Sequence, residues 1–168
     1  DVNPEDCWAD WHRLRAQLTG GYLPKIVLCI PGGKDFPGAC EAILANAGNE
    51  HEWGKREKGM TDAFKASEFR ANPSLEDEDR ELIEKHKSVL YVLSNNFPAG
   101  QARTVCQEML RLGRQLLDAG GVAIKCDSSG IAHSKARWIE LAEQAEKAKD
   151  DHKRWSARFD AFVQYPIS

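Results

Sequence analysis

The segment 127–133, DSSGIAH, carries the residues of this chain best suited to catalysis. Asp127 and His133 could form an acid–imidazole pair, and Ser128 or Ser129 could act as a nucleophile beside it. Because the segment precedes an expected helix, its hydroxyls and backbone amides could also hold an anion. Asp, Ser and Gly are equally the residues that turns and N-caps require, so a structural turn is the competing interpretation. The segment matches no nucleophile elbow, P-loop or dinucleotide-binding motif.

Two other polar loops follow apolar runs in the same way. They are 31–35 (PGGKD) and 94–98 (SNNFP), and the second contains Asn95. If the apolar runs are strands of a parallel sheet, the loops after them gather at one edge, where ligands bind. One hypothesis is therefore a small hydrolase or transferase that works at this edge. Its loop residues would be Asn95 and 127–133, and its catalytic residues Asp127, Ser128 and His133.

A second hypothesis places function on the surface, at a tryptophan and an acidic run. Trp53 lies in the polar stretch 48–59, and an exposed tryptophan in such a setting is typical of protein interfaces, although the ring could instead fold back onto the domain. The acidic run could dock a basic partner, or it could be a solvated helix start stabilised by the helix dipole. The candidate partner-binding residues are Trp53, Glu76, Asp77, Glu78 and Asp79.

The composition narrows the classes of function. The 168 residues are 42% hydrophobic and 29% charged, with a formal net charge of −3, which is the profile of an ordinary globular protein. That charge favours neither nucleic acid nor an anionic membrane as a partner, and no run of about 18 apolar residues predicts a membrane span. The histidines lack HxxxH or HxH spacing and the five cysteines lack a CxxC pair, so we expect no metal and no cofactor.

The cysteines also bear on the compartment. All five lie in apolar patterns, which predicts free thiols in the core and a cytoplasmic location. The chain begins at Asp1 and not at a methionine, so it could be a fragment of a longer protein.

Apolar periodicity predicts alternating helices and strands. Continuous apolar runs predict buried strands, and recurrence at i, i+3, i+4 and i+7 predicts helices. Strands are expected at 25–30, 88–93 and 122–126, with a weaker one at 161–165. Helices are expected at 4–19, 37–47, 61–70, 75–87 and 98–118, and from 134 onward with a division at Asp150-Asp151. The polar residues 49–59 are expected to form a loop or an irregular hairpin.

The order of these elements predicts the fold class. A strand, a helix and a strand follow one another within 88–126, which is the pattern of a βαβ unit with parallel strands. We therefore expect a single α/β domain over residues 1–168. Its sheet would be small and largely parallel, with three or four strands, and about six helices would flank it.

The region 88–140 resembles a known family. The residues that carry the likeness are Leu90–Leu93, Gly120–Lys125, Asp127–Ser134 and Trp138. They look like those of uncharacterised bacterial α/β domains that occur near polymorphic toxins and secretion systems, type VI systems among them. Small cytoplasmic proteins in that setting often serve as immunity factors. The resemblance implies no catalytic residues.

The favoured hypothesis is thus a non-enzymatic cytoplasmic binding protein, similar to an immunity protein that neutralises a cognate toxin by direct contact. The small α/β enzyme described above is the alternative.

Overall fold

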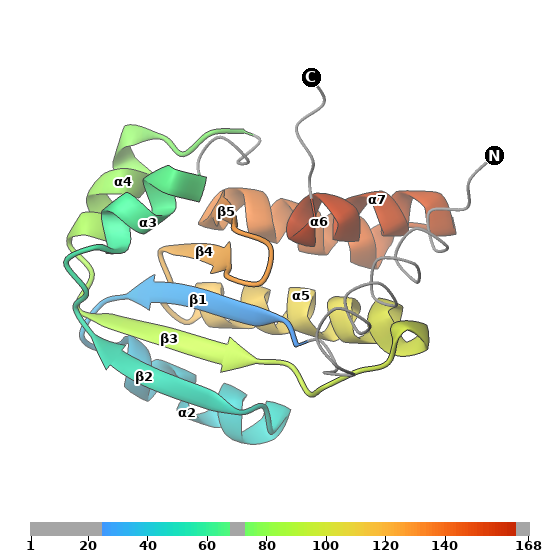
Figure 1. The fold of residues 1–168 in the computed structure, drawn as a ribbon, viewed down its shortest axis with the longest axis horizontal. Coiled ribbons are helices and arrows are strands. Elements are labelled where there is room, and N and C mark those ends of the chain that lie inside the picture. Colours follow the sequence, from blue (N-terminus) through green and yellow to red (C-terminus); the bar gives the residue numbers. More distant parts are fainter. Residues whose placement is uncertain (1–24, 68–72, 164–168) are drawn as a thin grey trace, which may run out of the picture.

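The computed structural model describes residues 25–67 and 73–163, which form one five-stranded sheet with helices on both faces. The strands lie in the order β2-β3-β1-β4-β5, and every neighbouring pair is antiparallel (Figure 1). The expectation of a largely parallel sheet of three or four strands is therefore wrong. The strand bounds are β1 Val27–Gly32, β2 His51–Lys55, β3 Ser88–Leu93, β4 Ala123–Cys126 and β5 Ile131–Ser134.

The error arose at the strand–helix–strand unit. Helix α5 (Ala102–Asp118) connects β3 to β4, and these two strands do run in the same direction, because both are antiparallel to β1. However, β1 lies between them, so that Cys29 pairs with Tyr91 on one side and with Lys125 on the other. The crossover thus spans a strand from earlier in the chain, as in the split βαβ arrangement. Local order along the sequence does not reveal this insertion.

Two strands lacked a clear sequence signal. The polar stretch 51–55 forms β2 at the edge of the sheet, where a strand needs no continuous apolar run. The segment 131–134 forms β5, which pairs with β4 through a tight turn that ends at Gly130 with φ 70°. The expected strand at 161–165 is wrong at its start, because Ala161 and Phe162 belong to helix α7. The rest of that stretch, beyond 163, lies outside the described residues.

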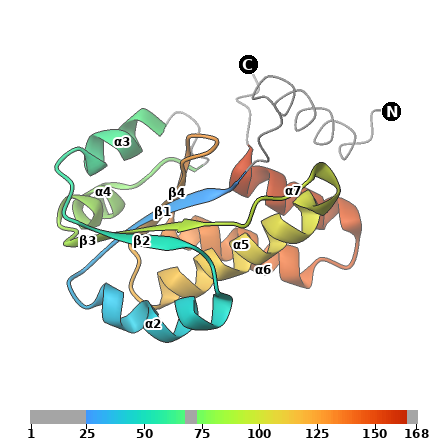
Figure 2. The same ribbon diagram turned by 60° about the horizontal axis from the view of Figure 1, so that its bottom comes forward.

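The helices divide into two layers. Helices α2 (Phe36–Ala47), α5, α6 (Lys135–Lys147) and α7 (Asp151–Phe162) cover one face, and α3 (Met60–Ser67) and α4 (Asp77–Glu84) cover part of the other (Figure 2). A short 3-10 turn, Ala99–Gln101, leads into α5. The expected division of the last helix is confirmed, because Asp150 caps α7 by accepting from the Lys153 amide. The helix expected at 4–19 lies outside the described residues.

The larger core lies under the first face and centres on Trp138. This ring is fully buried, donates its indole N–H to the Leu110 carbonyl at 3.0 Å and packs edge-on against Phe162. Helix α5 can approach this closely only because it carries Gly113, where an added Cβ would lie 2.7 Å from the Trp138 nitrogen. None of the helices in residues 25–67 and 73–163 has the length and apolar character that crossing a bilayer requires.

Candidate functional site

The loops expected to gather at one edge lie at two opposite ends of the sheet. Val27, at the start of β1, pairs with Leu93 at the end of β3, and Leu28 pairs with Cys126 at the end of β4. Loops 94–98 and 127–130 therefore lie at the end where β1 begins, and loop 31–35 lies at the other. This follows from the antiparallel sheet, since only parallel strands bring their carboxyl ends to one side.

Ser128 is part of the scaffold of the sheet. Its hydroxyl accepts from the Val27 amide at 2.9 Å and donates to the Lys25 carbonyl at 3.0 Å. The turn between β4 and β5 is thus fastened to the entry of β1, 101 residues away along the chain. With its proton held by a carbonyl and its lone pair by an amide, this hydroxyl is not poised as a nucleophile.

His133 points into the core from β5. The side chain is 1% exposed, its ring lies 5.8 Å from that of Trp138, and its Nε2 bonds the Ala161 carbonyl at 3.0 Å. Because a carbonyl only accepts, Nε2 carries a proton. Burial lowers the pKa of His133 to about 4, and the nearby Arg137 acts in the same direction. A general base for neutral pH needs a pKa near 7 and access to substrate, and His133 has neither.

Asp127 lies on the opposite face of the sheet from His133. Its carboxylate pairs with Lys125 Nζ at 2.8 Å. Lys125 pairs in the sheet with Ala132, and the Ala132 side chain lies on the second face, the one that α3 and α4 cover. Since successive side chains of a strand alternate between faces, the sheet separates Asp127 from His133. The structure therefore does not bring together the acid–imidazole pair that the enzyme hypothesis requires.

The second face carries a polar cluster that the sequence analysis did not single out. The Tyr91 hydroxyl lies 3.1 Å from each carboxylate oxygen of Glu57, and Cys29, which pairs with Tyr91 in the sheet, donates its thiol to the Met60 sulfur at 3.9 Å. Burial, Cys29 and Glu57 together raise the pKa of Tyr91, and burial foremost raises that of Cys29 to about 12. Both groups stay protonated at neutral pH, so they serve as hydrogen-bond donors and not as nucleophiles.

His86 positions one member of this cluster. It is 3% exposed; its Nε2 accepts from the Glu57 amide at 3.0 Å, and its Nδ1 bonds the Ile83 carbonyl. The ring thereby ties the segment after β2 to the end of α4. The alternation of side chains along SVLYVL could have indicated that Tyr91 lies on the second face, as the one polar side chain that the middle of this strand places there.

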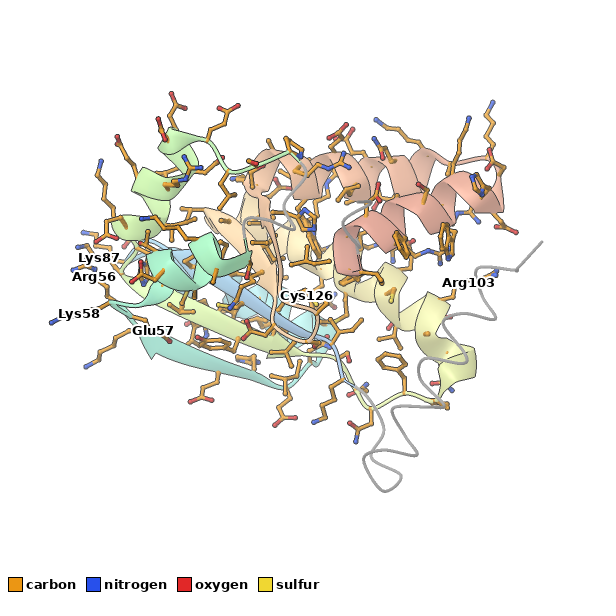
Figure 3. All side chains as sticks on the ribbon, turned by 45° about the horizontal axis from the view of Figure 1, so that its top comes forward. Arg56, Glu57, Lys58, Lys87, Arg103 and Cys126 are labelled. Carbon is orange, nitrogen blue, oxygen red and sulfur yellow. The ribbon has the colours of Figure 1, made fainter. Side chains whose placement is uncertain are left out.

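The remaining cysteines are buried and unreactive by the same argument. Cys40, Cys106 and Cys126 are at most 4% exposed, and burial raises the pKa of all three, to about 11 for Cys40 and about 12 for Cys106. Figure 3 shows Cys126 in the interior, beneath the helices. All four described cysteines are free thiols, while Cys7 lies outside the described residues. In the described part of the chain, no group of three or more His, Cys, Asp or Glu residues is arranged to hold a metal ion.

Trp53 lies in β2 and not in a loop. Its ring is partly buried and meets Phe36 of α2 edge-on, with ring centroids 5.2 Å apart. The ring thus folds back onto the domain, and only part of its surface is open to a partner.

The acidic run begins α4 and is exposed. Glu76 and Asp79 form a capping box with each other's backbone amides, and Asp77 pairs with Arg80 at 2.7 Å. Asp77 and Glu78 are the acids of this run that the cap does not use.

Comparison with protein-family models, curated proteins and solved structures finds no match to this chain. The likeness over 88–140 to toxin-associated domains therefore stays a prediction from the sequence.

Proposed function

We propose that this chain is a non-enzymatic protein-binding domain that works in the cytoplasm as an immunity protein, neutralising a cognate bacterial toxin by direct contact. One observation carries the proposal. The groups that the enzyme alternative would use are engaged by the fold: the Ser128 hydroxyl holds β1, His133 is buried and neutral, and Asp127 pairs with Lys125 on the opposite face. What is left for function is the surface, where recognition works through shape and charge complementarity.

Four free buried thiols support the cytoplasmic part of the proposal, because such thiols persist in a reducing compartment. Cys40 and Cys106 come from different helices, and neither forms a bridge with another described cysteine.

The start of α4 is the surface that we propose for the toxin. The Asp77 side chain is 96% exposed, and Glu78 beside it is also exposed. The helix dipole favours acidic side chains in the first turn of a helix, and Asp77 and Glu78 take no part in the capping box. A toxin with a basic surface around its own active site would fit this charge. Trp53 packs against Phe36 on the face that α2 covers, whereas α4 covers the other face, so Trp53 lies outside this surface.

The test is protection of growing cells. The protein is co-expressed with the toxin encoded beside its own gene, and survival is compared between variants. The double variant Asp77→Lys with Glu78→Lys should lose protection and should slow association measured with the purified pair, and the defect should shrink at high salt. Glu108→Lys, which reverses an exposed acid on α5, is the matched control and should protect fully.

The enzyme alternative predicts the opposite pattern. Asp127→Asn would then abolish function in a folded protein, while the changes at Asp77 and Glu78 would be silent. Thermal unfolding of each variant separates loss of function from loss of fold. Folded Asp127→Asn without protection, together with fully protective α4 variants, would refute the proposed function.

A further inference from the structure

Strand β2 leaves a row of backbone groups without a neighbouring strand. The Leu93 amide donates to the Glu50 carbonyl at 2.9 Å, so Glu50 turns its backbone groups toward β3, and Glu52 and Gly54 do the same by alternation. The amides and carbonyls of His51, Trp53 and Lys55 therefore point away from β3, toward the open edge of the sheet. The described part of the chain supplies no strand there, as Figure 1 shows.

The other edge of the sheet offers no such row. Strand β5 has four residues, all of them buried, and α6 begins directly after it. Natural sheets protect their edges by covering, shortening or charging them: β5 is short and buried, whereas β2 is uncovered and carries only the charges of Glu52 and Lys55.

Charges along the β2 edge change sign from one end to the other. Glu50 and Glu52 lie at its start, and Lys55 and Arg56 lie at its end. Figure 3 shows Arg56 at that end of the sheet, together with Lys58 and Lys87. An identical strand laid antiparallel alongside would meet acid with base, because its basic end would lie over the acidic start.

Pairing centred on Trp53 uses the whole strand. It places Trp53 opposite Trp53 of the second copy, and His51 opposite Lys55, so that the free backbone groups of all three residues bond across the edge. Glu50 then lies opposite Arg56 in a non-hydrogen-bonded pair, in which side chains come closest. A register centred on Glu52 would oppose two like charges, and one centred on Gly54 would pair only three residues of each strand.

Helix α2 beneath β2 is suited to the same contact. Its exposed residues include a single charged side chain, Glu41; the others are Gly38, Ala39, Ala42, Ala45, Asn46 and Ala47. Depletion of charge is the compositional mark of an interface core. Figures 1 and 2 both place α2 against the β2 side of the sheet.

We propose that two copies of this chain associate antiparallel through β2, forming one continuous ten-stranded sheet with a two-fold axis at Trp53 and the two α2 helices side by side. The same patch meets itself, which closes the assembly at a dimer. This proposal is independent of toxin binding, since it uses the β2 edge and α2 and leaves the start of α4 outside the contact.

The test exchanges the charges at positions 50 and 56. Light scattering measures the mass of each variant in solution, and analytical ultracentrifugation measures the dissociation constant of the dimer. The protein should have twice the 18.8 kDa of the chain. Arg56→Glu and Glu50→Arg should each weaken the dimer about tenfold or more, because each places like charges opposite one another twice. The double variant Glu50→Arg with Arg56→Glu should recover the dimer. Within one chain these positions are about 20 Å apart, so recovery cannot be intramolecular.

Control variants separate the edge from local stability. Within the chain Arg56 pairs with Glu84 at 3.0 Å and Glu50 pairs with Lys25 at 3.1 Å, and Glu84→Gln and Lys25→Gln remove these pairs without changing β2, so each should leave the dimer intact. Lys55→Pro removes an amide that points away from β3, and it should dissociate the dimer while Lys55→Ala does not. A monomer at every concentration, or a dimer that survives both Arg56→Glu and Lys55→Pro in folded protein, would overturn the proposal.

Discussion

Acid should destabilise this protein through His133. The imidazole is neutral in the folded state, with Nε2 bonded to the Ala161 carbonyl and with Nδ1 lacking a hydrogen-bond partner among the described residues. Burial, the largest effect, and the Arg137 cation both disfavour an added proton, and together they outweigh the backbone groups of Ala161 and Asp160, which favour it. A proton on Nδ1 would therefore be buried without a counter-charge.

The sign and size follow from linkage. The pKa of His133 falls from its ordinary value of 6.5 to about 4 on folding, so the unfolded chain takes up the proton first as the pH falls. Above pH 6.5 both states are neutral and the group contributes nothing. Between pH 6.5 and 4 the free energy of unfolding should drop by up to about 1.4 kcal/mol per pH unit, or about 3 kcal/mol in all.

Urea unfolding at several pH values measures how the free energy of unfolding depends on pH, and His133→Gln serves as the reference. Glutamine can still donate to the Ala161 carbonyl but does not titrate in this range. Since Asp160 and other carboxyls respond to acid in both proteins, the useful quantity is the difference between wild type and variant. Wild type should be the more stable at pH 7.5 and should lose most of that advantage by pH 4.5. Parallel curves over this range would refute the assignment of a buried neutral imidazole.

Three further outcomes follow from the packing. Gly113→Ala should cost about 1–3 kcal/mol in urea unfolding, because the new methyl would lie 2.7 Å from the Trp138 nitrogen, whereas Gly38→Ala, which points into open space, should not destabilise. Ser128→Ala should cost about 1 kcal/mol, because the partly buried Val27 amide loses its acceptor; full stability would show that the β4–β5 turn is not fastened there. The four described thiols should react with a thiol reagent only as fast as the protein unfolds, and fast labelling of the native state would contradict their burial.

Elements with a strong local pattern were predictable from the sequence. The run SVLYVL predicted the bounds of β3, and the apolar recurrence over 98–118 predicted the helix that forms α5. Both patterns arise because the element buries its apolar side chains in a large core, and the pattern does not depend on which other elements form that core. Strand β2 gave no such signal, since half of its surface faces solvent and its polar residues resemble those of a loop.

Topology was beyond the sequence, and the candidate site depended on it. Reading β3, α5 and β4 as a parallel unit placed loops 94–98, 127–133 and 31–35 at one edge, where they would form a cleft. Strand β1 lies between β3 and β4 and runs antiparallel to both, which sends loop 31–35 to the opposite end of the sheet. Strand β5, which the sequence pattern did not predict, also changes where the candidate residues lie. Once residues 131–134 pair with β4, alternation turns His133 into the core, while Asp127 stays with Lys125 on the other face. Along the chain these residues look like a catalytic group, but in the fold Ser128 holds the β4–β5 turn, His133 lies in the core and Asp127 forms an ion pair on the other face.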